Sequence, residues 1–188
     1  MVVNYLGGGS FKLQSGETSL LIDPEGNRFK ADVILRTLFA VGEKEEGESH
    51  ADISFPGEYE VKEIEVTGVP VKEESGEKFL KTIYLVRWDD IKFAFLGHLS
   101  KYPSAEIIES VDEPDVVFVP IGGGHFLSAE EAAKLIKKLK PSIVIPMFYK
   151  TPKDFLDTMG QKFQPEEKFV FKKKDLEAGK MRVVVLKE

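Results

Sequence analysis

Few side chains of this sequence could bind a metal or transfer protons. It contains no cysteine and only three histidines, His50, His98 and His125. The absence of cysteine removes disulfides, thiolate nucleophiles and cysteine-ligated zinc. Ser10 and Ser128 have no evident histidine and aspartate companions, so a serine nucleophile is not predicted. What remains is chemistry that relies on imidazole and carboxylate groups.

Two of the histidines lie in segments that favour a structural interpretation. His50 ends the run at residues 42–50, whose Glu, Lys and Gly content predicts an exposed loop. His125 follows Gly122-Gly123-Gly124, and free backbone N–H groups in such a turn can hold an anion. However, no further Gly or Lys-Ser/Thr is spaced as in a P-loop or dinucleotide fingerprint. We therefore interpret the glycines as a turn.

The elements that must position these residues follow from hydrophobic patterning. The first half of the chain has short apolar or alternating runs separated by Gly, Asp and Pro, which is typical of β-strands. In the second half, Ser128–Leu139 is amphipathic and begins with the capping-box pair Ser128 and Glu131. Further helices are predicted at Ser104–Ser110 and Pro152–Met159, and strands at Val116–Ile121 and Ile143–Ile145. This order predicts an α/β fold with a two-layer sheet core and helices outside it.

Composition sets broader bounds. A chain of 188 residues with 42% hydrophobic residues suits one compact domain, which we predict to span residues 1–188. No apolar run approaches the roughly 20 residues that span a bilayer, and no signal peptide is evident. A cytoplasmic location is therefore expected. The net charge of −6 disfavours a nucleic-acid partner, which demands a basic surface.

Six segments, in order along the chain, resemble the small hydrolase-like members of the metallo-β-lactamase superfamily. They are Gly7-Gly8-Gly9-Ser10-Phe11, Leu20-Leu21-Ile22-Asp23-Pro24, Ala31–Thr37, Pro56-Gly57-Glu58-Tyr59-Glu60-Val61, Leu96-Gly97-His98-Leu99, and the stretch from Val119 through Ala132 to Ile145-Pro146-Met147-Phe148-Tyr149. The resemblance implies an αββα sandwich, two mixed β-sheets with helices on the outer faces. It also implies an active site along one edge of the two sheets.

At the metal-ligand positions the sequence departs from the family. The family has a His-x-His-x-Asp-His loop. In this sequence the loop would follow Thr37, and its four ligand positions are occupied by Leu38, Ala40, Gly42 and Glu43. Phe148 stands where the family has its last histidine. A hydrolytic zinc site needs about three protein ligands and an open position for water. Leu, Ala, Gly and Phe side chains have no donor atom, so ordinary family catalysis is not predicted.

Three ligand slots keep a side chain that could donate to a metal. They are Glu43, Glu73 in place of a branch histidine, and His98 in the slot of the metal-bridging aspartate. Together they could form a site of two carboxylates and one imidazole. We interpret them instead as polar residues lining a cleft, with His125 near its rim. Asp23, which would help to position a metal loop, is predicted to stabilise its own turn.

The leading hypothesis is therefore a catalytically degenerate protein of this fold, without cofactor, that binds or assembles with a protein or small-molecule partner. The alternative is a hydrolase with a remodelled site that depends on zinc, manganese or iron and acts on an ester, amide, lactone or phosphodiester. A nucleic-acid-binding factor is the least favoured of the three. No membrane partner is expected, and a homo-oligomer is compatible with the resemblance.

Overall fold

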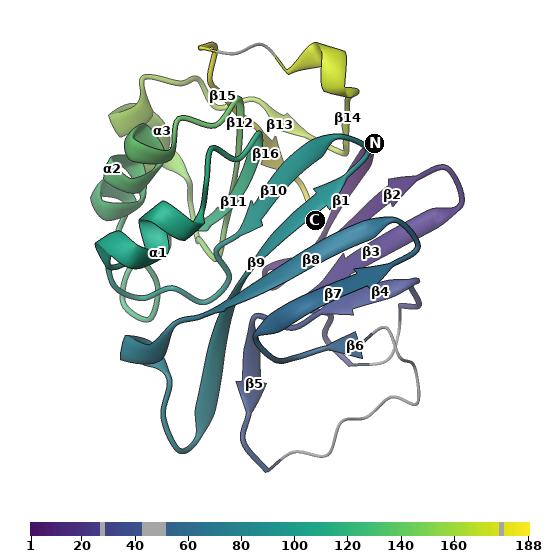
Figure 1. Cartoon of the computed structure of the whole chain (residues 1–188). Helices are drawn as coiled ribbons and strands as arrows, with labels where there is room; N and C mark the ends of the chain where they lie inside the picture. The colour runs from purple at the N-terminus through teal and green to yellow at the C-terminus, as the bar shows by residue number, and fades with distance from the viewer. Residues whose placement is uncertain (27–28, 43–51, 177–178) are drawn as a thin grey trace.

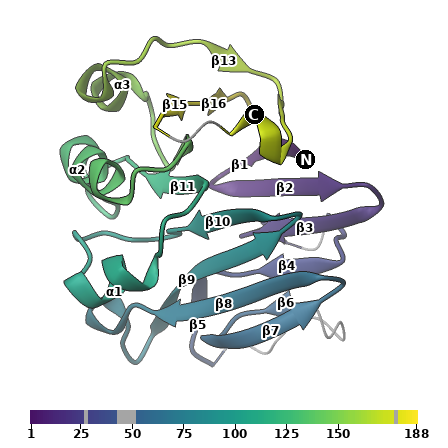
Figure 2. The same cartoon turned by 45° about the horizontal axis from the view of Figure 1, so that its top comes forward.

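The computed structural model describes residues 1–26, 29–42, 52–176 and 179–188. The apolar runs form two β-sheets that pack face to face (Figures 1 and 2). The first sheet has the strand order β14-β1-β2-β3-β4-β6. Its strands are β1 (Val2–Gly7), β2 (Ser10–Ser15), β3 (Thr18–Ile22), β4 (Val33–Leu35), β6 (Asp52–Ile53) and β14 (Phe169–Val170).

The second sheet has the order β15-β12-β11-β10-β9-β8-β7, with β5 paired to β9. Its strands are β5 (Leu38–Ala40), β7 (Gly57–Val61), β8 (Ile64–Pro70), β9 (Phe79–Trp88), β10 (Ile91–Phe95), β11 (Val116–Pro120), β12 (Ile143–Met147) and β15 (Arg182–Val183). Strands β7 to β10 run antiparallel, and β10, β11, β12 and β15 run parallel. Two short strands, β13 (Pro165–Glu166) and β16 (Val185–Leu186), pair separately.

Two apolar layers hold the molecule together. The layer between the sheets includes Phe118, whose ring contacts those of Phe11 and Phe95. The other layer lies between the second sheet and the three α-helices of the described chain, which Figure 1 shows along one side of the molecule. These helices are α1 (Ala105–Ser110), α2 (Ala129–Leu139) and α3 (Lys153–Met159), and two short 3-10 helices are η1 (Lys72–Glu74) and η2 (Lys173–Asp175). The α/β sandwich predicted from the sequence is confirmed.

The amphipathic helix begins as its sequence predicts. The Ser128 side chain accepts a hydrogen bond from the backbone N–H of Glu131, and the Glu131 carboxylate accepts one from the backbone N–H of Ser128. Such caps satisfy donors that the first turn of a helix leaves unpaired. We expect Ser128→Ala to lower the free energy of unfolding by about 1 kcal/mol in urea titrations. Lys137→Ala, on an exposed face of the same helix, is the matched control and is expected to change it little.

Residues 38–40 differ from the sequence prediction. The family resemblance placed a degenerate metal loop there, but Leu38–Ala40 form strand β5, which pairs with the start of β9 in the register Leu38↔Lys81 and Ala40↔Phe79. The pairing continues on both sides, with Thr82 N–H donating to Thr37 O and Val41 N–H donating to Lys78 O. The partner strand lies about forty residues away in sequence, so no local pattern predicts this pairing. In the described part of the chain, no helix is both long and apolar enough to cross a membrane.

Candidate active site at the edge of the sheets

The side chains that the resemblance grouped meet where strands from both sheets end. Asp23 follows β3, Thr37 lies between β4 and β5, His98 follows β10, and Phe148 follows β12. Strands β3 and β4 are parallel, as are β10, β11 and β12, so their carboxyl ends gather at one edge. Clefts at the carboxyl ends of parallel strands commonly hold functional sites in α/β proteins. The resemblance predicted that these residues lie near one another, but it did not predict the hydrogen bonds between them.

A chain of hydrogen bonds joins Asp23, Thr37 and His98. Thr37 donates to both Asp23 carboxylate oxygens, from its backbone N–H and its hydroxyl, each at 2.6 Å. The Thr37 hydroxyl oxygen also lies 2.8 Å from His98 Nδ1. Because the single hydroxyl proton goes to Asp23, we assign the proton of this second bond to Nδ1. His98 Nε2 therefore carries a lone pair, and no described residue hydrogen-bonds to it.

Burial shifts the pKa values of Asp23 and His98 in this hydrogen-bonded group. It raises the pKa of Asp23 to about 6, although the hydrogen bonds from Thr37 and the charge of Arg36 act in the opposite direction. Burial also lowers the pKa of His98 to about 4, and the positive charge of Lys81 adds to this effect. The side chain of His98 is 20% exposed, so one edge of the ring remains accessible. At neutral pH the imidazole is thus neutral and can accept a proton or bind an electrophile through Nε2.

Aromatic rings form the other wall of the site. The Phe148 ring lies 4.7 Å from the His98 ring and stacks on Phe126 at 4.3 Å with an interplanar angle of 8°. Gly9 makes room for it, because a Cβ atom at that position would overlap the Phe148 ring. Phe148 also has a φ of 56°, a left-handed conformation that is uncommon for a bulky residue. An apolar stack therefore occupies the position where the family has its last histidine ligand.

The described residues do not fit the metal centre of the family. Among them no group of three or more His, Asp or Glu side chains could hold an ion. Leu38 and Ala40 have no donor atom, and their backbone belongs to the β5–β9 ladder. Both oxygens of Asp23 already accept hydrogen bonds from Thr37. Among the described residues, the hydrogen-bonded group supplies one imidazole, His98, which is short of the three ligands that a hydrolytic zinc site uses.

The other residues singled out from the sequence lie elsewhere. Glu73 is exposed on η1, whereas the carboxylate of its neighbour Glu74 turns inward with only 4% of the side chain exposed. His125 is exposed, and it is the next residue, Phe126, whose ring lies 6.0 Å from His98. Glu43 lies outside the described residues. Sequence reasoning missed Glu74 and Phe126, each one position from a residue that it did select.

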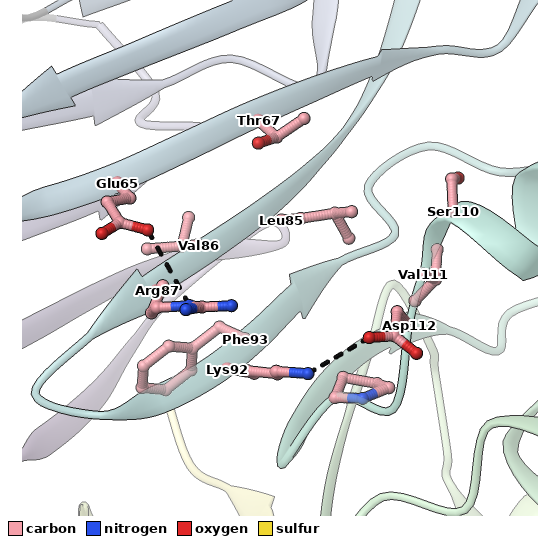
Figure 3. A pocket seen from close by; sticks show the side chains of 11 residues that line it. Glu65, Thr67, Leu85, Val86, Arg87, Lys92, Phe93, Ser110, Val111 and Asp112 are labelled. Carbon is pink, nitrogen blue, oxygen red and sulfur yellow. Dashed lines mark hydrogen bonds and ion pairs between the residues drawn. The ribbon is translucent and has the colours of Figure 1, made fainter.

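A hollow of about 180 Å³ lies on the outer face of the second sheet beside the end of α1 (Figure 3). Two ion pairs cross it, between Glu65 and Arg87 at 3.8 Å and between Lys92 and Asp112 at 3.3 Å. Its four charged groups are thus paired with one another. A site that recognises a ligand needs polar groups that converge on it, and the charged groups of this hollow are engaged with one another instead.

Comparison with solved structures defines the class of protein. The structure superposes with a TM-score of 0.79 on a Thermotoga maritima protein described as a Zn-dependent hydrolase of the metallo-β-lactamase superfamily, at 21% identity, covering 98% of this chain and 97% of that one. A metallo-hydrolase from Ignicoccus hospitalis gives a TM-score of 0.66 at 18% identity, covering 91% and 99%. At these identities the likeness establishes a metallo-β-lactamase fold.

Sequence comparison then establishes the family. The family described as the β-lactamase superfamily domain matches residues 2–148, so the chain belongs to the metallo-β-lactamase superfamily. It is 30% identical over 134 residues to a UPF0173 metal-dependent hydrolase of Pyrococcus furiosus, covering 65% of this chain and 59% of that protein. A UPF0173 metal-dependent hydrolase of Staphylothermus marinus is 26% identical over 144 residues, covering 77% and 59%. The chain thus spans about three fifths of the length of these relatives.

Proposed function

We propose that the chain is a hydrolase of this superfamily with a remodelled site, in which His98 takes a proton from the attacking water. The observation that carries the proposal is the orientation of the His98 ring, with Nδ1 tied to Thr37 and Nε2 without a partner among the described residues. The relatives in Pyrococcus furiosus and Staphylothermus marinus are named metal-dependent hydrolases, which supports hydrolysis but not the part assigned to His98. No metal-bound water enters this proposal, because the described donors do not suit such a centre.

The chemistry follows from the three residues of the hydrogen-bonded chain. Water attacks the carbonyl carbon of the substrate while His98 Nε2 accepts one of its protons, and Nε2 then returns that proton to the leaving group. During this step the imidazolium is stabilised by the carboxylate of Asp23, which lies 3.9 Å from Nδ1 and is connected to it through Thr37. A base with a pKa of about 4 is weak at neutral pH. The substrates that suit it are esters and lactones with good leaving groups, rather than amides.

The test is a set of hydrolysis assays with aryl esters, a lactone and a phosphodiester. Each is run after treatment with a chelator and again with added zinc, manganese or iron. We expect ester or lactone turnover that survives the chelator and falls about 100-fold in His98→Ala, as for loss of a general base. His125→Ala, which changes an exposed histidine outside the hydrogen-bonded chain, is the control. Full activity in His98→Ala would contradict the proposal, whereas turnover only with added metal would restore the metal-dependent alternative.

A second candidate function is that of a binding scaffold without catalysis. One observation favours it, namely that Phe148 and Phe126 stack on each other beside His98, where the family places a metal ligand. An apolar surface of this kind suits a protein or a small apolar molecule better than an ion. Under this proposal no substrate is turned over with or without metal. Phe148→Ala would then weaken binding of the partner while leaving His98 in place.

A further inference from the structure

A buried group of charged and polar side chains contacts the backbone at His98 and in the residues that follow it. We call Glu74, Lys81 and Ser100 the Glu74 clamp. Lys81 Nζ donates to Glu74 at 2.7 Å, and it lies 3.4 Å from Ser100 Oγ. The side chains of Glu74 and Lys81 are only 4% and 17% exposed. Burial alone would raise the pKa of Glu74, but its bonds to Lys81, Ser100 and Lys101 hold that pKa below its usual value.

The clamp holds the backbone at His98 and in the residues that follow it. Lys81 Nζ donates to the carbonyl oxygen of His98 at 2.7 Å. Two residues further on, the Glu74 carboxylate accepts bonds from the N–H of Ser100 at 2.9 Å and from the N–H of Lys101 at 2.9 Å. These contacts tie the segment after β10 to η1 and to β9. A buried ion pair contributes little net stability compared with apolar packing, and in some proteins its role is instead to specify one arrangement of the groups that it joins.

The segment needs such an anchor because it has no regular structure of its own. Residues 96–104, between β10 and α1, contain no helix or strand. Gly97 packs so closely on Thr37 that a Cβ atom there would overlap the threonine side chain. The bond of 2.8 Å between Thr37 and His98 Nδ1 therefore depends on where the backbone of residues 97–101 lies. A displacement of about 1 Å would take this pair beyond hydrogen-bond distance.

We propose that the Glu74 clamp positions His98, so that Nδ1 stays bonded to Thr37 and Nε2 faces outward. Its importance for turnover rests on the proposed function, but the geometry of the histidine can be measured without a substrate. Glu74, Lys81 and Ser100 are positioning residues in this proposal, because none of them reaches the exposed edge of the imidazole. They act through the backbone of residues 97–101.

Nuclear magnetic resonance of the histidine rings in the whole chain tests the proposal. In the unmodified protein we expect His98 to be a single tautomer protonated at Nδ1. In Lys81→Met and Glu74→Gln we expect a mixture of both tautomers, and in Lys81→Met the pKa of His98 also rises as the nearby positive charge is lost. Lys81→Arg is expected to restore most of the single tautomer. Ser100→Ala, which removes only a hydroxyl, provides a milder variant that retains the fold if the others do not.

The control is Lys92→Met, which breaks an exposed ion pair with Asp112 on the outer face of the sheet and leaves the tautomer of His98 unchanged. With an active protein, kcat is expected to fall about 100-fold in Lys81→Met with a smaller change in KM, as for a misplaced catalytic group. An unchanged tautomer in folded Lys81→Met, Glu74→Gln and Ser100→Ala would overturn the clamp proposal. The predicted tautomer shift without any turnover would support the clamp and refute the proposed hydrolase.

Discussion

Acidification from about pH 6.5 to about pH 4 is expected to affect the stability of His98→Gln and Asp23→Asn in opposite directions. Relative to the unmodified protein, His98→Gln should gain about 3 kcal/mol over this interval and Asp23→Asn should lose about 3 kcal/mol. In the unmodified protein these two groups together should change the free energy of unfolding little over this interval. The result follows because the pKa values of two groups at one site are shifted in opposite directions.

The signs are set by which state of the protein binds protons more tightly. The pKa of Asp23 is raised from 3.8 to about 6, so its contribution to stability is complete below pH 3.8 and is lost as the pH rises through 6. The pKa of His98 is lowered from 6.5 to about 4, so its contribution is complete above pH 6.5 and is lost as the pH falls through 4. Near pH 5 the folded pair carries its proton on Asp23 and the unfolded pair carries it on His98. The number of bound protons is equal, and the two effects cancel.

Urea unfolding followed by the fluorescence of Trp88, at several pH values across this interval, measures the effect. His125→Gln serves as the control, because it removes an exposed imidazole that takes no part in the hydrogen-bonded chain. Its stability should run parallel to that of the unmodified protein. If the free energies of unfolding of Asp23→Asn and His98→Gln depended on pH in the same way, burial would not shift the pKa values of the two groups as described.

The hydrogen-bonded chain and the aromatic stack suggest what keeps this edge ordered. Asp23, Thr37 and His98 link the ends of β3, β4 and β10, and Phe148 ties the end of β12 to the same point. Here each link is made from groups that satisfy one another, which stabilises a buried polar site. The fold is thus compatible with the loss of donors at Leu38, Ala40 and Phe148.

Local signals in the sequence predicted the elements well but the contacts of the site only in part. The cap of α2 needed only Ser128 and Glu131, which lie within one turn, and the predicted helix is confirmed. The role of Glu74 could not be read in this way. Whether Glu73 or Glu74 turns inward depends on the 3-10 turn of η1 and on Lys81, which lies in the next strand, β9. Strand β5 likewise exists because of its distant partner, β9.

A glycine beside the site gives the second large expected effect. Gly122 follows β11, and a Cβ atom at this position would overlap the backbone carbonyl oxygen of Phe148. A backbone atom cannot swing away as the end of a side chain can, so the two segments would have to separate. We expect Gly122→Ala to lower the free energy of unfolding by about 3 kcal/mol, at the upper end of the cost of overpacking. The separation would also move Phe148 away from His98.

Gly76→Ala is the matched control for this change. Gly76 lies in the turn before β9, and a Cβ atom there would meet no atom within 4 Å. Its φ does not lie in the left-handed region, so alanine is tolerated and restricts the unfolded chain. Urea titrations should therefore place Gly76→Ala within about 0.5 kcal/mol of the unmodified protein. Equal stability of the two alanine variants would mean that the loops after β11 and β12 do not pack as closely as described, and the wall formed by Phe148 would then not be fixed by Gly122.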